Sequence, residues 1–312
     1  LVLGYLDPDN FAGGRMKLDR EAASRAIQEV AEKLQMNPLE CAAGICRNVE
    51  LQMADIIRKV TVEKGFDPRD FVLFAFGGAG PAHAGVFARE LGVRKVIVPQ
   101  RKAASTWCAF GAAAADVLHI FEHTEIMQTP IDAARVNKII AALEQKARNL
   151  MTEEGIAAAR QRFEFSLDVR HRGQINEVEV ALAEERLSSG SEARVRRDFV
   201  TRYEKLYGRG SALHGAQLEV VVCRLRARAL TPRPTLRKSA KLSKAIPKAA
   251  IRKPRSIQWS AAKAPRSSPV YDGDRLAIGN VVRGPAIVET SDTTVVVHPR
   301  SRLRVGPLGN FG

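Results

Sequence analysis

The chain of 312 residues has few of the residues that build metal centres or disulfide frameworks. Its four cysteines, Cys41, Cys46, Cys108 and Cys223, form no Cys-x-x-Cys pair, and its six histidines are scattered along the sequence. We therefore predict no metal site and no disulfide framework. The cysteines are interpreted as small apolar residues buried in the fold of a protein from a reducing compartment.

Long apolar runs are missing as well. No segment approaches the roughly 18 to 20 apolar residues of a membrane-spanning helix, and the opening residues Leu1-Val2-Leu3-Gly4 do not resemble a signal peptide. A cytoplasmic protein that does not bind membranes is expected. The sequence begins without methionine, which suggests that its natural beginning lies further upstream.

Acidic residues are absent from residues 224–268, which hold fourteen Lys and Arg, whereas the whole chain has a net charge of +15. The remaining residues therefore have a net charge of only +1. This segment is interpreted as a solvated linker or as a surface that docks on an acidic partner. Binding to nucleic acid is the disfavoured alternative, because Trp259 is its one residue suited to base stacking.

The stretch Phe71–Val86, FVLFAFGGAGPAHAGV, carries the strongest local pattern. Its apolar run Phe71–Phe76 predicts a central strand covered on both faces, as in a parallel sheet between helices. The glycine turn that follows can admit a ligand close to its amides. Pro81 suits the first position of a helix, and the N-terminus of a helix attracts phosphate.

The glycine turn has two interpretations. It binds a nucleotide through Gly77, Gly78, Ala79 and Gly80, or it is only a tight connection between strand and helix. The P-loop and the dinucleotide-binding fingerprint do not apply, because no Gly-Lys-Ser/Thr and no later acidic ribose ligand stand at the required spacing.

Four regions follow from periodicity and composition. Residues 1–130 form an α/β lobe with two amphipathic helices before the glycine turn, and residues 131–230 form an antiparallel α+β domain. Residues 231–269 are rich in Pro, Lys and Arg and predict a linker. Residues 270–312 alternate short apolar runs with turns and predict a small β module.

Several motifs, in order, resemble the large subunit of the hydantoinase A, 5-oxoprolinase and acetone or acetophenone carboxylase family. Those of the first half are Leu3-Gly-Tyr-Leu-Asp-Pro-Asp, Val62-Glu-Lys-Gly and Phe76-Gly-Gly-Ala-Gly-Pro-Ala-His-Ala. Those of the second half are Arg172-Gly-Gln, Tyr203-Glu-x-Leu-Tyr-Gly, Gly284-Pro-Ala-Ile-Val-Glu and Asp292-Thr-Thr-Val-Val-Val-His-Pro. The resemblance covers nearly the whole chain except the basic segment.

The resemblance implies the second lobe of an actin/hexokinase-like ATPase fold, in which two lobes clamp ATP. Members of the family phosphorylate a poorly reactive oxygen, and this chemistry requires Mg²⁺ and cationic groups around the transferred phosphoryl group. Gly77, Gly78, Ala79 and Gly80 are expected on the nucleotide side, whereas the catalytic residues stay unassigned.

One departure from the family limits the expected activity. The family's first lobe opens with an Asp-x-Gly-Gly-Thr turn, and neither Gly-Gly pair of this chain, at Gly13 and Gly77, is followed by Thr. The chain therefore corresponds to the carboxy-terminal half of a large subunit, either separately encoded or a fragment. It should need a partner that supplies the missing lobe.

Three functions remain open at this point. A subunit of an ATP-dependent ketone carboxylase of the acetophenone carboxylase type is preferred on chain size. A subunit of a hydantoinase- or 5-oxoprolinase-type cyclic amide hydrolase is the first alternative. The second alternative is a non-catalytic structural subunit of such a complex.

Overall fold

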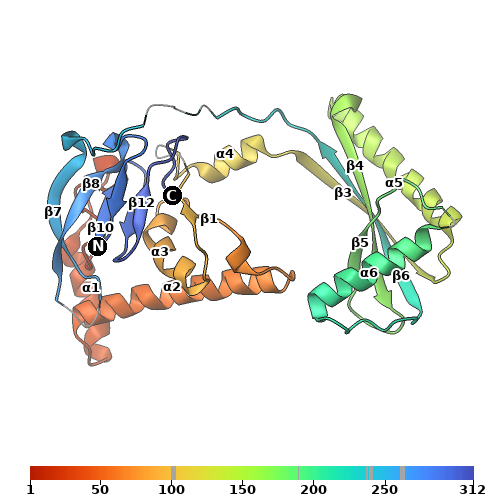
Figure 1. The fold of residues 1–312 in the computed structure, drawn as a ribbon, viewed down its shortest axis with the longest axis horizontal. Coiled ribbons are helices and arrows are strands. Elements are labelled where there is room, and N and C mark those ends of the chain that lie inside the picture. The colour runs from red at the N-terminus through yellow and green to blue at the C-terminus, as the bar shows by residue number, and fades with distance from the viewer. Residues whose placement is uncertain (100–102, 189, 237, 239–241, 261–263) are drawn as a thin grey trace. The chain divides into compact units, whose positions relative to one another are not determined.

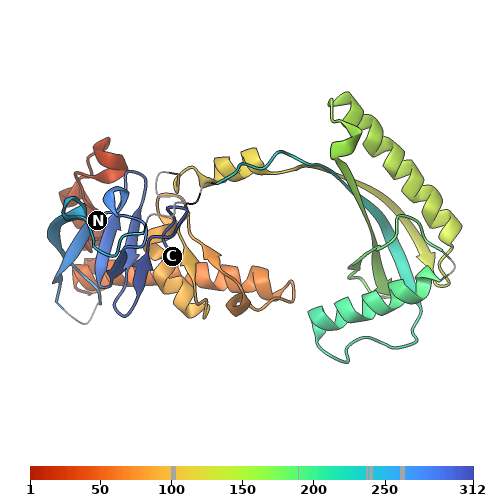
Figure 2. The same ribbon diagram turned by 45° about the horizontal axis from the view of Figure 1, so that its top comes forward.

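A computed structural model describes residues 1–99, 103–188, 190–236, 238, 242–260 and 264–312. The chain divides into two compact units (Figures 1 and 2). Unit 1 comprises Leu1–Ala113 with Thr235–Gly312, and unit 2 comprises Ala114–Pro234. Unit 2 is therefore inserted into the sequence of unit 1.

Unit 1 combines helices from the first part of the chain with strands that come mostly from its end. Its helices are α1 (Arg20–Lys33), α2 (Pro38–Val62), α3 (Gly80–Glu90) and α4 (Trp107–Ala114), the last of which reaches the unit boundary. Its strands are β1 (Leu73–Phe74), β2 (Val96–Ile97), β7 (Ile251–Ile257), β8 (Arg266–Asp272), β9 (Val281–Arg283), β10 (Ala286–Glu289), β11 (Thr294–Val297) and β12 (Arg302–Arg304).

The first two helices begin at residues whose side chains cap them. The Asp19 carboxylate accepts a hydrogen bond from the Ala22 amide, which satisfies one of the unpaired N–H groups at the start of α1. Asn37 caps α2 through the Leu39 amide, and Pro38 occupies the first turn. Local polar chemistry thus fixes where both helices start.

The main sheet of unit 1 has the strand order β11-β10-β8-β7. β10 pairs antiparallel with β11 and parallel with β8, and β8 pairs antiparallel with β7. Phe87 of α3 and Ala54 of α2 share one hydrophobic core with Val288 and Val297 of this sheet. The carboxy-terminal strands are therefore part of the helical lobe, and the prediction of a separate β module over 270–312 is wrong.

The predicted central strand over residues 71–76 is much shorter in the structure. Only Leu73–Phe74 is a strand, and among the described residues its one neighbour is β2, with which it pairs in parallel. Phe71, Val72, Phe74 and Phe76 are each between 38% and 50% exposed. The prediction of burial on both faces is wrong within the described residues, because a two-stranded sheet offers the run too few neighbours.

Unit 2 is a four-stranded antiparallel sheet with two helices, as predicted in outline. Its strands lie in the order β3-β6-β4-β5, and α5 and α6 pack on it (Figure 1). Their bounds are β3 (Val117–Gln128), α5 (Ala133–Glu153), β4 (Gln161–His171), β5 (Val178–Ala181), α6 (Ser191–Tyr207) and β6 (Leu218–Ala229). Strand β3, which was not predicted, already belongs to unit 2, so the predicted boundary at residue 130 lies too late.

The sheet of unit 2 has one apolar and one charged set of side chains. Phe165 pairs with Leu225 and Leu167 with Cys223 in register, and all four are buried in the core with α5 and α6. The alternate residues of β6 are arginines. Their ion pairs are Arg224 with Glu122, Asp168 and Glu179, Arg226 with Glu179, and Arg228 with Glu164.

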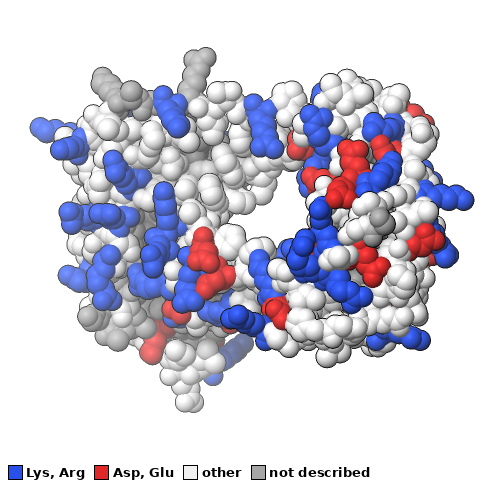
Figure 3. All heavy atoms as spheres, turned by 45° about the vertical axis from the view of Figure 1, so that its right-hand side comes forward, with Lys and Arg blue, Asp and Glu red and all other residues white. Residues whose placement is uncertain are grey.

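The basic segment is therefore not a linker throughout. Residues 251–257 and 266–272 form β7 and β8, although residues 237, 239–241 and 261–263 lie outside the described residues. Arg252 and Arg255 pair with Glu289, an acid distant in sequence, which the local composition could not reveal. Figure 3 shows Asp and Glu among the Lys and Arg of the face it displays. Within the described residues, no helix combines the length and apolar character needed to cross a membrane.

Candidate functional site

The glycine turn connects β1 to α3 inside unit 1. Gly77 has a φ of +81°, a conformation that favours glycine, and its amide donates to the Ala104 carbonyl at 2.7 Å. Gly78 and Gly80 have no positive φ, and among the described residues a Cβ added at Gly77, Gly78 or Gly80 would meet nothing within 4 Å. Backbone conformation thus demands glycine only at 77, whereas the space in front of all three glycines is open.

The turn leads directly into a helix of eleven residues whose N-terminus has no side-chain cap. Ala79 is the N-cap residue, and Pro81 lies in the first turn as predicted. The amides at this end and the positive end of the helix dipole have no carboxylate or hydroxyl of the N-cap side chain to satisfy them. The geometry suits an anionic group such as a phosphate.

A second loop, Thr290–Thr293, supports the turn from the opposite end of the sequence. The Thr293 hydroxyl donates to the Gly78 carbonyl at 3.0 Å. Thr290 closes this loop, since its amide and hydroxyl both donate to the Thr293 carbonyl, at 2.9 and 3.0 Å. The Ser291 amide donates to Asp274 at 2.9 Å. The loop is therefore well ordered by its own hydrogen bonds and holds the glycine turn by one of them.

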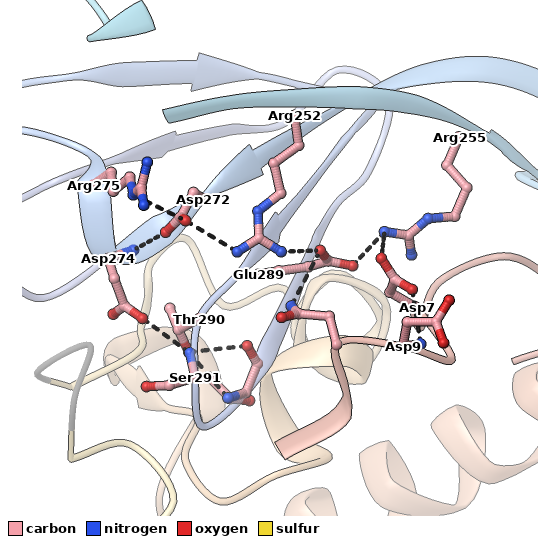
Figure 4. Close-up of polar contacts among 12 residues, drawn as sticks. Asp7, Asp9, Arg252, Arg255, Asp272, Asp274, Arg275, Glu289, Thr290 and Ser291 are labelled. Atoms are coloured by element: carbon pink, nitrogen blue, oxygen red, sulfur yellow. Dashed lines mark hydrogen bonds and ion pairs between the residues drawn. The ribbon is translucent and has the colours of Figure 1, made fainter. Parts of the chain in front are cut away.

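Behind this loop lies a network of ion pairs centred on Glu289 (Figure 4). The Glu289 side chain is 2% exposed and pairs with Arg252 at 2.9 Å and with Arg255. Arg252 also contacts Asp272 at 3.0 Å, and Arg255 reaches Asp7 at 3.6 Å. The network joins strands β7, β8 and β10 to the amino-terminal loop, so it fixes the base from which Thr290–Thr293 projects.

A second polar cluster lies between α2 and α3, and the sequence analysis missed it. Nδ1 of His83 lies 3.2 Å from Oε1 of Glu50 and 3.7 Å from Sγ of Cys46, and Sγ and Oε1 are 3.5 Å apart. The contacts with Cys46 and Glu50 raise the pKa of His83 to about 9. Cys46 and Glu50 lie four residues apart in a predicted helix, and this spacing places their side chains on the same helix face. The sequence alone could therefore have indicated this pair. The third member could be found only from the packing of α3 on α2.

Three further polar residues of unit 2 have partners of their own. Asp116 accepts from the Thr231 amide and His119 contacts Glu154 at 2.9 Å, so these two do not form a pair. His171 is buried against Phe199 and Tyr203. These residues of unit 2 serve its internal packing.

The fold and the turn together define a mixed α/β protein in which a strand and a glycine turn lead into a helix without a side-chain cap. The chain belongs to the hydantoinase/oxoprolinase family. Residues 1–121 match the family model described as Hydantoinase/oxoprolinase, and residues 125–306 match the Hydantoinase/oxoprolinase C-terminal domain. The predicted family is therefore confirmed.

Relatives with described functions carry different activities. The chain is 32% identical to the caprolactamase subunit alpha of Pseudomonas jessenii, over 100% of this chain and 45% of that protein. It is also 32% identical to the acetophenone carboxylase gamma subunit of Aromatoleum aromaticum, over 99% of this chain and 43% of that protein. The chain thus spans less than half the length of these curated relatives.

Two solved structures resemble the fold of this chain. A crystal structure of the ATP-dependent caprolactamase from Pseudomonas jessenii matches with a TM-score of 0.86 and 31% identity, over 99% of this chain and 45% of that one. A nucleotide-free acetone carboxylase structure matches with a TM-score of 0.71 and 28% identity, over the same shares. The predicted α/β class, that of the second lobe of an ATPase-like fold, is confirmed.

Proposed function

We propose that this chain supplies one side of an ATP-binding cleft in an ATP-dependent enzyme of the hydantoinase family. Gly77, Gly78, Ala79 and Gly80 would contact the nucleotide through their backbone. The observation that carries this proposal is the open space in front of three glycines at an uncapped helix N-terminus. The likeness to an ATP-dependent caprolactamase and to acetone carboxylase, whose carboxylation is ATP-dependent, supports it.

The other side of the cleft would come from polypeptide outside residues 1–312. This sequence lacks the family's Asp-x-Gly-Gly-Thr turn, and its relatives are more than twice as long as the region matched. A partner subunit or a further segment would hold Mg²⁺ and the terminal phosphate, whose charge Mg²⁺ neutralises during phosphoryl transfer. Residues of this chain would then bind and orient the nucleotide.

Two substrate classes fit a carbonyl oxygen activated by phosphorylation. The higher structural likeness to caprolactamase, 0.86 against 0.71 for acetone carboxylase, favours a cyclic amide. Equal identity to acetophenone carboxylase gamma supports a small ketone as the second candidate. Chain size, on which the preference for a ketone rested, does not separate them, because the chain covers 45% of one relative and 43% of the other.

The affinity for ATP of the complex that contains this chain tests the proposal. Gly78→Asp places a carboxylate in the open space and should weaken ATP binding at least tenfold by charge repulsion. Gly78→Ala adds only a methyl group where nothing lies within 4 Å, and it should bind ATP nearly as the wild type does. Unchanged affinity in Gly78→Asp would instead favour a structural subunit whose glycine turn is only a tight connection.

Turnover assays on the same complex separate the substrate classes. We expect ATP hydrolysis to be stimulated by a lactam or another cyclic amide. Stimulation only by a ketone together with bicarbonate would assign the complex to the carboxylases.

A further inference from the structure

Three different metal-ligating atoms meet between α2 and α3. Cys46 and Glu50 lie one helical turn apart on α2, and His83 lies on α3, three residues after Gly80. All three donor atoms lie within 4.8 Å of one another. The side chain of Glu50 is 6% exposed and that of His83 is 26% exposed, so the cluster is shielded but reachable from solvent.

The distances between the donor atoms match those around a tetrahedral zinc ion. With Zn–S of about 2.3 Å and Zn–N and Zn–O of about 2.0 Å, a tetrahedral site has donor separations of about 3.5 Å for both S–N and S–O and about 3.3 Å for N–O. The corresponding distances here are 3.7, 3.5 and 3.2 Å. One ion could therefore contact all three atoms without moving either helix.

Hydrogen bonds also join this cluster, because the Cys46 thiol can donate to Oε1 of Glu50 at 3.5 Å. The same atom, Nδ1 of His83, faces both Cys46 and Glu50, and a ring nitrogen carries at most one hydrogen. That hydrogen can point fully at only one acceptor. A cation bound to the lone pair of Nδ1, to the thiolate and to the carboxylate would satisfy all three groups at once.

We propose that Cys46, Glu50 and His83 form a binding site for Zn²⁺ or a similar thiolate-binding divalent cation. Thiolate, imidazole and carboxylate are ligands that zinc accepts, and magnesium does not favour sulfur. Three protein ligands leave a fourth position for water or another ligand. The ion would also cross-link α2 to the helix that begins at the glycine turn. The site is independent of the proposed nucleotide binding.

Metal binding to the whole protein tests this proposal, with Zn²⁺ alone as the ligand and Co²⁺ as the spectroscopic probe. After treatment with a chelator, the protein should bind one equivalent of Zn²⁺ at this site. It should also show the near-ultraviolet charge-transfer band of a Co²⁺–thiolate bond. Cys46→Ala, Glu50→Gln and His83→Gln should each weaken Zn²⁺ binding at least tenfold, and Cys46→Ala should remove the cobalt band.

Cys108→Ser is the matched control, because Cys108 is an exposed free cysteine outside the cluster. It should retain both the zinc equivalent and the cobalt band. Zn²⁺ should raise the Tm of the wild type and of Cys108→Ser but not of Cys46→Ala, and circular dichroism checks that each variant is folded. The proposal is wrong if the wild type binds no Zn²⁺, or if folded Cys46→Ala and His83→Gln bind it as the wild type does.

Discussion

Strands β1 and β4 both come from sequence rich in phenylalanine, yet their surroundings differ. In β4, Phe165 is 5% exposed, because the strand has neighbours on both edges and helices α5 and α6 over its apolar face. In β1, Phe74 is 50% exposed, and the strand has only β2 beside it. Unit 2 thus completes its own core, whereas unit 1 leaves apolar strand surface uncovered within the described residues.

This difference indicates which contacts stabilise each unit. Twenty-one buried residues form the core cluster of unit 2, which is a size expected of an independent domain. The apolar run before the glycine turn is typical of a strand covered on both faces. The curated relatives are more than twice as long as the region they share with this chain. We therefore expect the missing cover of β1 to come from outside residues 1–312.

The largest expected effect compares the same substitution in the two units. Phe199 is fully buried in unit 2 and packs on His171 and Tyr203. Phe199→Ala should destabilise that unit by about 3 to 5 kcal/mol, because it removes apolar contacts and leaves a cavity. Phe74→Ala should cost less than about 1 kcal/mol in the isolated chain. Calorimetry of both variants measures this, and equal losses would remove the distinction between the units.

A second comparison concerns buried and exposed ion pairs. Glu289→Gln removes the charge that Arg252 and Arg255 share in unit 1, and should cost about 3 kcal/mol because two partly buried arginines lose a partner. Glu164→Gln in unit 2 removes a pair whose side chains are 36% and 58% exposed, and should cost less than about 0.5 kcal/mol. Urea unfolding of each variant tests the expected order, and the reverse order would contradict it.

Acid should weaken unit 1 through His298. Burial lowers the pKa of His298 from the usual 6.5 of a histidine to about 4. Its contribution to stability is therefore complete above pH 6.5 and is lost as the pH falls from 6.5 toward 4, since the unfolded chain binds the proton first. The loss should reach about 2 kcal/mol at pH 5. The same pH series on His298→Asn should lack this component, and identical pH profiles would rule it out.

The sequence predicted those features that depend on neighbours along the chain. The turn at Gly77, the helix start beside Pro81 and the outline of unit 2 all follow from local residue types. The sequence could not predict pairings between distant segments. Arg252 finds its acid at Glu289, and His83 meets Cys46 and Glu50 only through helix packing. The basic segment was misinterpreted because its neutralising acids lie elsewhere in the chain.

The central claim is that this chain and another polypeptide share the nucleotide site. ATP turnover, measured for the chain alone and for its assembled complex, tests this claim most directly. We expect residues 1–312 alone to hydrolyse no ATP above background. Addition of the polypeptide that carries an Asp-x-Gly-Gly-Thr turn should restore hydrolysis that Gly78→Asp abolishes. Turnover by the isolated chain, or a complex unaffected by Gly78→Asp, would contradict the proposal that these residues form one side of a shared cleft.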